Sequence, residues 1–321
     1  MPVYKGERFL REAIDSILNQ TFTDFEFIII NDGSTDGTLE IIQSYSDKRI
    51  RLVNNESNQG IVACLNHGIE LAQGEYIARM DADDISLPER FEKQIRFLEE
   101  NPDVGVCGTW RKNIDANGDI IGERTHPKED YLIKWKLFLN TNPISHPTIL
   151  MRADLVKSVG GYNEKFKHCE DYDLWRRLIY KTKIYNIPEF LLSYRYHDNN
   201  ITTTQQSTQM DNSKKIAIGL MSELIVEPKK IELFFSEKEK NKNLYTKIYV
   251  MKNFQKYFIK KFKLKNEEKK IIHELSSDLL IKYFHENNEK INLKWFLLLS
   301  QVFMGNIYFR RRIIKRIIPT I

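Results

Sequence analysis

The chain has 321 residues, 41% of them hydrophobic, and a formal net charge of +5. This length suits one large domain or one domain with an appendage. The three cysteines, Cys64, Cys107 and Cys169, are odd in number and far apart, which excludes a disulfide framework and indicates reduced thiols in a cytosolic protein. We expect no signal peptide, because the opening residues contain no apolar segment, and no membrane-spanning helix, because no run of about 18 apolar residues occurs.

Charge is distributed unevenly along the chain. Residues 1–200 carry a net charge of −7, whereas residues 201–321 carry +12. The second part also has fewer turn signals and longer helix-forming stretches. We therefore predict an α/β domain over residues 1–204 and a basic helical region over residues 205–321.

Apolar patterns in the first part alternate between helical spacing and short continuous runs. Residues 7–19 place Phe9, Ile14 and Ile17 on one face, as in an amphipathic helix. The next run, residues 25–30, is mostly apolar and is typical of a buried parallel strand. The alternation continues, with strands predicted at residues 50–53, 76–80 and 104–109 and with helices through Leu39, at residues 61–72 and at residues 88–101. This order predicts a mainly parallel sheet flanked by helices, with ligands bound at the carboxyl ends of the strands.

Acidic side chains gather at these strand ends. Asp32 follows the strand at residues 25–30, and Asp81-Ala82-Asp83-Asp84 follows the strand at residues 76–80. Neighbouring carboxylates repel one another, so a fold that holds them together needs a cation or a hydrogen-bonded ligand. Hard oxygen ligands favour Mg²⁺ or Mn²⁺, which bridge to nucleotide phosphates. Many acidic loops are merely solvated, and it is the position at a strand end that favours a site here.

Three further residues have an ordinary structural explanation when each is considered alone. Asp171 opens an amphipathic helix, whose dipole favours negative charge at that end. His146 precedes a proline and is explained as a buried hydrogen-bonding residue. His197 is explained as a surface residue at the end of a strand.

Eight motifs change this interpretation because they occur together and in order over residues 1–200. They are M-P-V-Y, F-x-x-I-I-I-N-D-G-S-T-D-G-T, N-Q-G-I, G-E-Y-I-A-R-M-D-A-D-D, S-H-P-T, G-G-Y, E-D-Y-D-L-W and Y-R-Y-H. The series resembles the family-2 glycosyltransferases of the GT-A fold, in particular inverting enzymes of bacterial surface-polysaccharide assembly. The resemblance implies a nucleotide-diphosphate sugar as the donor, preferably a UDP-sugar. It also implies a hydroxyl group of a glycan or of a lipid-linked molecule as the acceptor.

The resemblance assigns the nucleotide to two turns and a loop. Pro2 and Val3 belong to the turn that carries Tyr4, whose ring would stack on the base. Asp32 would accept a hydrogen bond from the ring N–H of a uracil or thymine. Asn58, in the N-Q-G-I motif, would border the nucleotide.

The resemblance also assigns the chemistry. Asp81 and Ala82 would contact the ribose or the sugar, and Asp83 would bind Mn²⁺ or Mg²⁺. His197 would close over the metal or the diphosphate, and imidazole suits Mn²⁺ better than Mg²⁺. Asp171 would be the base that takes the proton of the acceptor hydroxyl. Since metal charge stabilises a diphosphate leaving group, the second carboxylic acid that a glycosidase uses is not needed.

The sequence departs from the family pattern at two places. Relatives carry apolar residues before the M-P-V-Y motif that form a central first strand, so we expect this strand to be missing here. The chain would then be poorly stable unless apolar residues lie upstream. Many relatives have an arginine at the position of Leu65. Arg79 could supply that charge, although pairing with a nearby acid is the stronger expectation.

The last part of the chain suggests a second kind of contact. Residues 307–318 predict a helix with isoleucines on one half and four basic residues on the other. Such a helix can lie on an anionic membrane, and packing on its own catalytic domain is an equal alternative. Nucleic acid is not expected, because the basic residues lack interleaved aromatic platforms. We thus expect a cytoplasmic protein, either free or attached peripherally to the inner face of the cell membrane.

Two other functions compete with sugar transfer. A nucleotidyltransferase would share the α/β layout, but it should show a glycine-rich phosphate loop with a basic residue near the N-terminus, which the sequence lacks. A catalytically inactive nucleotide-sugar-binding or scaffold protein is the closer alternative, because of the missing first strand.

Overall fold

The structure is a computed structural model that describes residues 1–198, 200, 204–225, 227–236 and 244–286. The chain divides into two compact units, Met1–Ser213 and Lys214–Ile321. The division falls within helix α9 (Gln206–Leu224), which begins just after the predicted boundary at residue 204.

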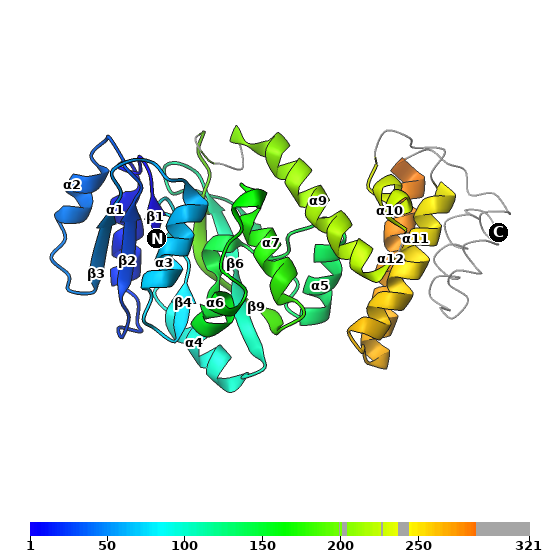
Figure 1. Ribbon diagram of the computed structural model, residues 1–321. Coiled ribbons are helices and arrows are strands. Elements are labelled where there is room, and N and C mark those ends of the chain that lie inside the picture. The colour runs from blue at the N-terminus through cyan, green and yellow to red at the C-terminus, as the bar shows by residue number, and fades with distance from the viewer. Residues whose placement is uncertain (199, 201–203, 226, 237–243, 287–321) are drawn as a thin grey trace. The chain divides into compact units, whose positions relative to one another are not determined.

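The first unit begins with a three-stranded sheet. Strands β1 (Pro2–Val3), β2 (Phe27–Asn31) and β3 (Ile50–Asn54) are all parallel, in that order. Helices α1 (Leu10–Leu18), α2 (Thr38–Gln43) and α3 (Ile61–Leu71) connect these strands and the next sheet (Figure 1). The apolar residues that predicted α1 pack on the sheet, since Leu10, Ile14 and Ile17 are buried with Ile29. The helical spacing of apolar residues in the sequence therefore correctly predicted α1 and the face that it packs on the sheet.

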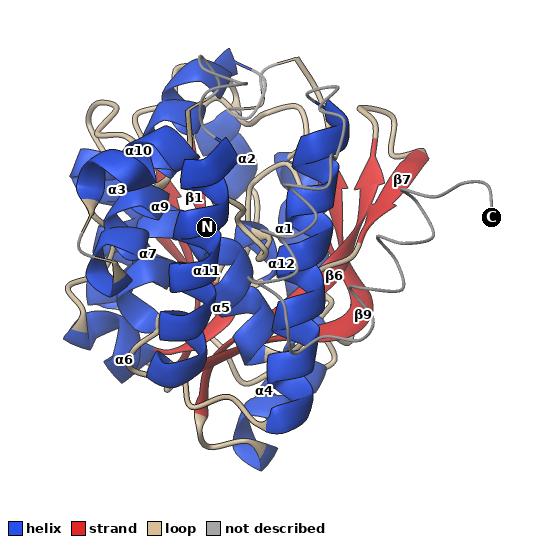
Figure 2. Ribbon diagram, turned by 90° about the vertical axis from the view of Figure 1, so that its right-hand side faces the viewer, coloured by secondary structure: helices blue, strands red, loops and turns tan. Residues whose placement is uncertain are grey.

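The second sheet is mixed. Strands β4 (Tyr76–Ala78), β8 (Leu150–Arg152), β6 (Val104–Ile114), β9 (Lys183–Arg195) and β5 (Ile85–Ser86) lie in that order, and β7 (Ile120–Arg124) pairs with β6. Only β6 and β9 are parallel here, and the other pairs are antiparallel. Figure 2 shows β7 beside β6 at the sheet edge. The α/β class is confirmed, but the expected parallel arrangement holds for the first sheet and not for the second. The second sheet differs because β7 runs back along β6 after the hairpin at Asn117-Gly118, and because β8 runs antiparallel to both β4 and β6.

The first strand is present, although it is short, which corrects the expectation that it is missing. Pro2 and Val3 lie opposite Ile30 and Asn31. The amino group of Met1 donates to the Ile28 oxygen at 2.8 Å, and the Ile30 amide donates to the Met1 oxygen at 3.0 Å. β1 therefore pairs with β2 along only part of the length of β2.

A largely apolar cavity of about 620 Å³ continues from Met1 between the two sheets. Phe27 and Ile28 of β2 and Tyr76 and Ile77 of β4 contribute to its lining. Burial lowers the pKa of the Met1 amino group to about 5, and the charge of Arg79 adds to this shift.

The remaining elements of the first unit place the second half of the site. Helices α4 (Arg90–Glu100), α5 (Asp130–Phe138), α6 (Ala153–Ser158) and α7 (Glu170–Leu178) accompany the second sheet, with 3₁₀ turns at His146–Thr148 and Glu164–Phe166. Along α7, Tyr172, Trp175 and Leu178 are buried. This apolar face fixes the helix, so its first turn presents acidic residues at a defined place.

The described part of the second unit is helical, as predicted. Helices α10 (Pro228–Phe234), α11 (Leu244–Lys261) and α12 (Asn266–Glu286) follow α9, and Phe254, Phe258 and Ile272 are buried among them. The predicted amphipathic helix at residues 307–318 lies outside the described residues. Over the ranges that the structure describes, no helix combines the length and apolar character needed to cross a membrane.

Candidate active site

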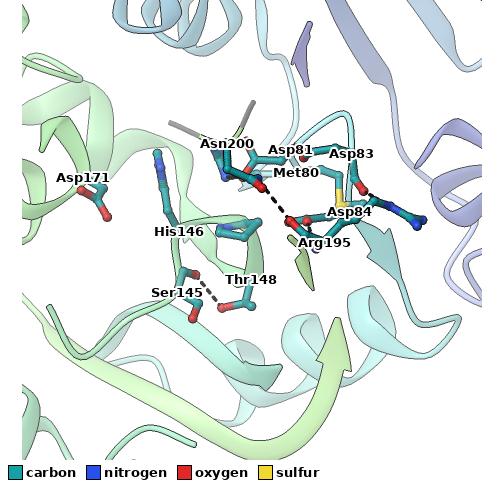
Figure 3. Close-up of polar contacts among 12 residues, drawn as sticks. Met80, Asp81, Asp83, Asp84, Ser145, His146, Thr148, Asp171, Arg195 and Asn200 are labelled. Atoms are coloured by element: carbon teal, nitrogen blue, oxygen red, sulfur yellow. Dashed lines mark hydrogen bonds and ion pairs between the residues drawn. The ribbon is translucent and has the colours of Figure 1, made fainter. Parts of the chain in front are cut away.

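Three carboxylates converge in the loop after β4, residues 81–84, which we call the acidic loop. Ligand oxygens of Asp81, Asp83 and Asp84 lie within 4.8 Å of one another (Figure 3). Asp84 is 1% exposed, and its Oδ2 has no hydrogen-bond partner among the described residues. Burial raises the pKa of Asp84 well above its usual value, and the charge of Asp83 adds to the shift. An orphaned buried carboxylate oxygen beside two other carboxylates fits a divalent cation with hard oxygen ligands.

Two buried arginines hold the acidic loop. Arg79 forms an ion pair with Asp81, which agrees with the expectation that Arg79 pairs with an acid. The guanidinium of Arg90 donates to the Arg79 oxygen at 2.7 Å and to the Pro147 oxygen at 3.0 Å. It thereby ties the end of β4 to the 3₁₀ turn that carries His146. Burial raises the pKa of Asp81, which the charge of Arg79 opposes.

The end of β9 brings His197 to the acidic loop. His197 Nε2 lies 2.9 Å from Asp83 Oδ2, and its ring packs 5.1 Å from the Phe9 ring. Arg195 is 1% exposed. Its guanidinium donates to the backbone carbonyl oxygen of Asp83 at 2.9 Å and to Glu12 Oε2 at 2.7 Å. Asn200 accepts from the His197 amide and donates to the Arg195 oxygen. The structure thus brings together Asp83 and His197, the two residues that the resemblance assigned to the metal.

Asp32 holds the loop that carries Asn58. Asp32 is 3% exposed, and its carboxylate accepts from the Asn55 side chain at 2.8 Å and from the Gln59 and Gly60 amides at 2.8 and 2.9 Å. Burial acts to raise its pKa, but these three hydrogen bonds outweigh burial and lower it. The Cys64 thiol is a further hydrogen-bond partner of this carboxylate. Contact between Asp32 and the nucleotide base stays a prediction.

The first turn, which carries the exposed side chains of Tyr4 and Lys5, lies next to the acidic loop. Tyr4 is 48% exposed, whereas Val3 is buried in the core, so Val3 can offer a ligand only its backbone. The Asp32 amide donates to the Val3 oxygen at 2.8 Å, which places the two predicted nucleotide turns side by side. A Cβ added to Gly6 would lie 4.0 Å from the Cβ of Ala82. The turns of Tyr4 and Ala82 are therefore neighbours, as the resemblance requires.

Asp171 lies at the start of α7. Its Oδ2 accepts from the Asn142 side chain at 2.6 Å, and its Oδ1 accepts from the Tyr172 amide at 2.7 Å. Burial raises the pKa of Asp171, which these two hydrogen bonds oppose. Asp173, two residues further along α7, is fully buried and pairs with Arg177 at 2.8 Å. Asp173 therefore has a structural partner, whereas Asp171 has only hydrogen-bond donors.

His146 lies between Asp171 and the acidic loop in the view of Figure 3. Its Nε2 lies 2.8 Å from the Tyr162 hydroxyl, so the interpretation as a buried hydrogen-bonding residue is confirmed. Burial and the nearby charge of Arg79 lower its pKa well below the usual value, which keeps the ring neutral. Sequence reasoning did not identify Asn142, Tyr162 or Arg195 as neighbours of the site. Only the S-H-P-T, G-G-Y and Y-R-Y-H motifs, which contain or adjoin His146, Tyr162 and Arg195, gave any signal.

The α/β sheet flanked by helices, with an acidic loop after β4 and a helical C-terminal region, is GT-A-like. The profile described as "Glycosyl transferase family 2" matches residues 1–160. An uncharacterized glycosyltransferase of Haemophilus influenzae is 33% identical over 270 residues, which cover 77% of this chain and 83% of the relative. The O-antigen biosynthesis glycosyltransferase WbnJ of Escherichia coli is 36% identical over 213 residues, covering 64% and 81%.

The solved structures agree on the fold. S. aureus TarS 1–349 in complex with UDP-GlcNAc matches with a TM-score of 0.58 at 18% identity, covering 96% of this chain and 91% of that one. Together with the sequence relatives, this establishes that the chain belongs to glycosyltransferase family 2, and it is a glycosyltransferase.

Proposed function

We propose that this glycosyltransferase transfers a sugar from a UDP-sugar to a hydroxyl group of a glycan or lipid-linked acceptor, with inversion at the anomeric carbon. The observation that carries the proposal is the pair of separate acid centres, the acidic loop with His197 and the partly buried Asp171. The assignment to cell-surface polysaccharide biosynthesis is supported by the similarity to an O-antigen biosynthesis enzyme. The similarity to a structure in complex with UDP-GlcNAc supports a UDP-sugar donor.

The nucleotide part of the donor is assigned to the two turns. Tyr4 supplies an exposed aromatic face for the base, and Pro2 and Val3 set the backbone that carries it. Asp32 keeps Asn58 at the edge of this site through its hydrogen bonds to the Gln59 and Gly60 amides. Asp81 and Ala82 are assigned to the ribose or sugar.

The diphosphate is assigned to the acidic loop. Asp83 and His197, which approach to 2.9 Å, would hold Mn²⁺ or Mg²⁺. When bound, the cation supplies positive charge that stabilises the diphosphate leaving group. Arg195 and Asn200 keep His197 in reach of Asp83, and Arg79 keeps Asp81 oriented by its ion pair.

Asp171 is assigned as the general base. The acceptor oxygen forms a bond to the anomeric carbon, and its proton passes to an Asp171 carboxylate oxygen. The bond between the anomeric carbon and the diphosphate oxygen breaks, and its electron pair leaves with the diphosphate. Because attack and departure occur on opposite faces of the carbon in one displacement, the anomeric configuration inverts. Glu170 and Asp173 shape the site around this carboxylate.

The location of the enzyme is proposed from the sequence. The net charge of +12 over residues 201–321 favours contact with an anionic surface. We place the enzyme in the cytoplasm, attached peripherally to the inner face of the membrane where a lipid-linked acceptor would be presented.

The proposal is tested by screening the purified protein against a panel of nucleotide sugars, with and without glycan acceptors, and measuring release of the nucleoside diphosphate. Acceptor-stimulated release of UDP from one donor, with a product of inverted configuration, is the expected result. Binding of a nucleotide sugar with no turnover under any acceptor would instead support an inactive binding protein.

A further inference from the structure

Asn142 is fixed in an orientation that serves Asp171. It lies in the segment between α5 and the 3₁₀ turn at His146. Its side-chain Oδ1 accepts from the Ile144 amide at 3.3 Å, and its Nδ2 donates to Asp171 Oδ2 at 2.6 Å. Because the first bond uses the amide oxygen, the amide nitrogen must face the carboxylate. Asn142 therefore offers Asp171 a hydrogen-bond donor rather than an acceptor.

Asp171 shares its surroundings with a second buried carboxyl group. Glu170 is 7% exposed, and its Oε2 has no hydrogen-bond partner within the part of the chain that the structure describes. The two carboxyls are adjacent, Glu170 buried and Asp171 partly buried, so ionisation of one disfavours ionisation of the other. The one that receives more N–H donors is the one that ionises first. Asp171 receives two such donors, from Asn142 and Tyr172.

We propose that Asn142 is a positioning residue that keeps Asp171, rather than Glu170, as the ionised carboxylate facing the acceptor. The inference rests on the proposed role of Asp171 as the base. Asn142 does not touch the reacting atoms; it acts through Asp171 by orienting the carboxylate and stabilising its negative charge. In agreement, burial and the neighbouring Asp171 raise the pKa of Glu170 to about 7. Burial also raises the pKa of Asp171, but its hydrogen bonds with the Tyr172 amide and the Asn142 side chain oppose that rise.

The other groups that face Asp171 keep one charge state over the working range. Cys169, on the same helix, has a pKa raised to about 12 by burial and by Asp171. The phenol groups of Tyr162 and Tyr172 also have pKa values raised by burial, so both stay neutral. Arg79 stays positive, since Asp81 outweighs burial and raises its pKa. These groups therefore leave the carboxyls as the ones that change charge here: Glu170 and Asp171, together with Asp81, whose charge acts on Glu170 and whose own pKa is raised by burial.

The test is the pH profile of kcat/KM for Asn142→Ala and Asn142→Asp, measured with saturating acceptor, together with UDP affinity by calorimetry. Loss of the donor destabilises the carboxylate, so the acid limb of the profile should move to higher pH by about 1 unit in the alanine variant. The aspartate variant has the same shape but adds a negative charge, so its shift should be larger. On the acid limb the alanine variant should lose about 10-fold in activity and the aspartate variant more, and both should recover at high pH with UDP affinity unchanged.

A matched control is Asn163→Ala. Asn163 accepts from the Lys165 amide in an exposed turn, without contact to Asp171, so its profile should match that of the wild type. A fall in activity that is equal at every pH would give Asn142 a purely structural role and overturn the inference, as would unchanged profiles for both variants.

The role of Asn142 and the role of Asp171 are tested by different variants. If Asp171→Asn abolishes transfer and the Asn142 profiles do not move, only the inference about Asn142 is wrong. If Asp171→Asn transfers sugar at the wild-type rate, the base assignment is wrong, and the inference falls with it.

Discussion

His197 and Asp83 are joined by a contact of 2.9 Å between Nε2 and Oδ2, although 114 positions separate them in the sequence. The contact holds the segment that follows β9 against the acidic loop. Both groups are metal ligands by chemical type, and Asp83 also lies within 4.8 Å of two other carboxylates. A cation bound here would be held by the loop after β4 and by the segment after β9.

Metal dependence is the first prediction. Asp83→Ala removes the carboxylate that lies against His197, and Asp81 is held away from this role by its ion pair with Arg79. Transfer should fall by at least ~100-fold, a few kcal/mol of lost charge stabilisation, with the fold retained. EDTA should abolish wild-type activity, and Mn²⁺ or Mg²⁺ should restore it.

Asp211→Ala serves as the control for that prediction. Asp211 is exposed on α9 within the first unit, so the substitution changes charge without touching the acidic loop. Near-normal activity of the wild type in EDTA would contradict the metal assignment.

The second prediction separates two aspartates of α7 by function and stability. Asp171→Asn keeps the shape of the side chain but removes the base, so transfer should fall by ~10²–10⁴-fold while UDP affinity stays near the wild-type value. Asp173→Asn breaks the ion pair between the fully buried Asp173 and the partly exposed Arg177, so it should instead lower the free energy of unfolding by about 3 kcal/mol. Activity assays and denaturant unfolding of both variants give the comparison. Loss of UDP binding in Asp171→Asn would place that residue in the donor site.

The sequence predicted those features that depend on local pattern. The alternating apolar runs set β2, β3 and their helices, because burial of one helix face or one strand is encoded within a few residues. The resemblance placed Asp83 and His197 in one site. The contacts of Asn142 with Asp171, and of Arg195 with Asp83 and Glu12, depend on packing between distant segments. No spacing rule connects such residues, and the same holds for the antiparallel register of β8 on β4 and β6.

The third prediction concerns the cavity beside Met1. The pKa of the buried amino group is lowered from 8.0 to about 5. Between these values the unfolded chain binds a proton that the folded chain does not, so stability should rise as pH rises from about 5 to about 8. An engineered extension of Gly-Ser residues before Met1 should remove this contribution, because an amide replaces the amine. Thermal unfolding of both proteins across this pH range measures the difference.

An engineered extension of four apolar residues should do more than the Gly-Ser extension. Such residues can continue β1 along β2 and fill the space between Ile28 and Tyr76. Burying apolar side chains in an existing cavity stabilises the folded state, so the melting temperature should exceed that of the Gly-Ser protein by at least ~5 °C. Equal melting temperatures for the two extensions would show that the cavity does not accept a strand.

The last prediction concerns attachment to membranes through the basic end of the chain. In residues 307–318, Arg311, Arg312, Lys315 and Arg316 lie on one half of the predicted helix. Each basic side chain near an anionic surface contributes ~1 kcal/mol, so four could localise the enzyme without a spanning helix. The binding should weaken with salt, because the Debye length falls from ~10 Å at 0.1 M to ~3 Å at 1 M. In liposome flotation, the full chain should float with anionic vesicles at low salt and stay at the bottom with neutral vesicles or at 1 M salt. A chain ending at Asn306 should not float under any of these conditions. If both chains float equally with anionic vesicles, the segment after Asn306 is not the attachment site, and if neither floats, the enzyme does not bind membranes by charge.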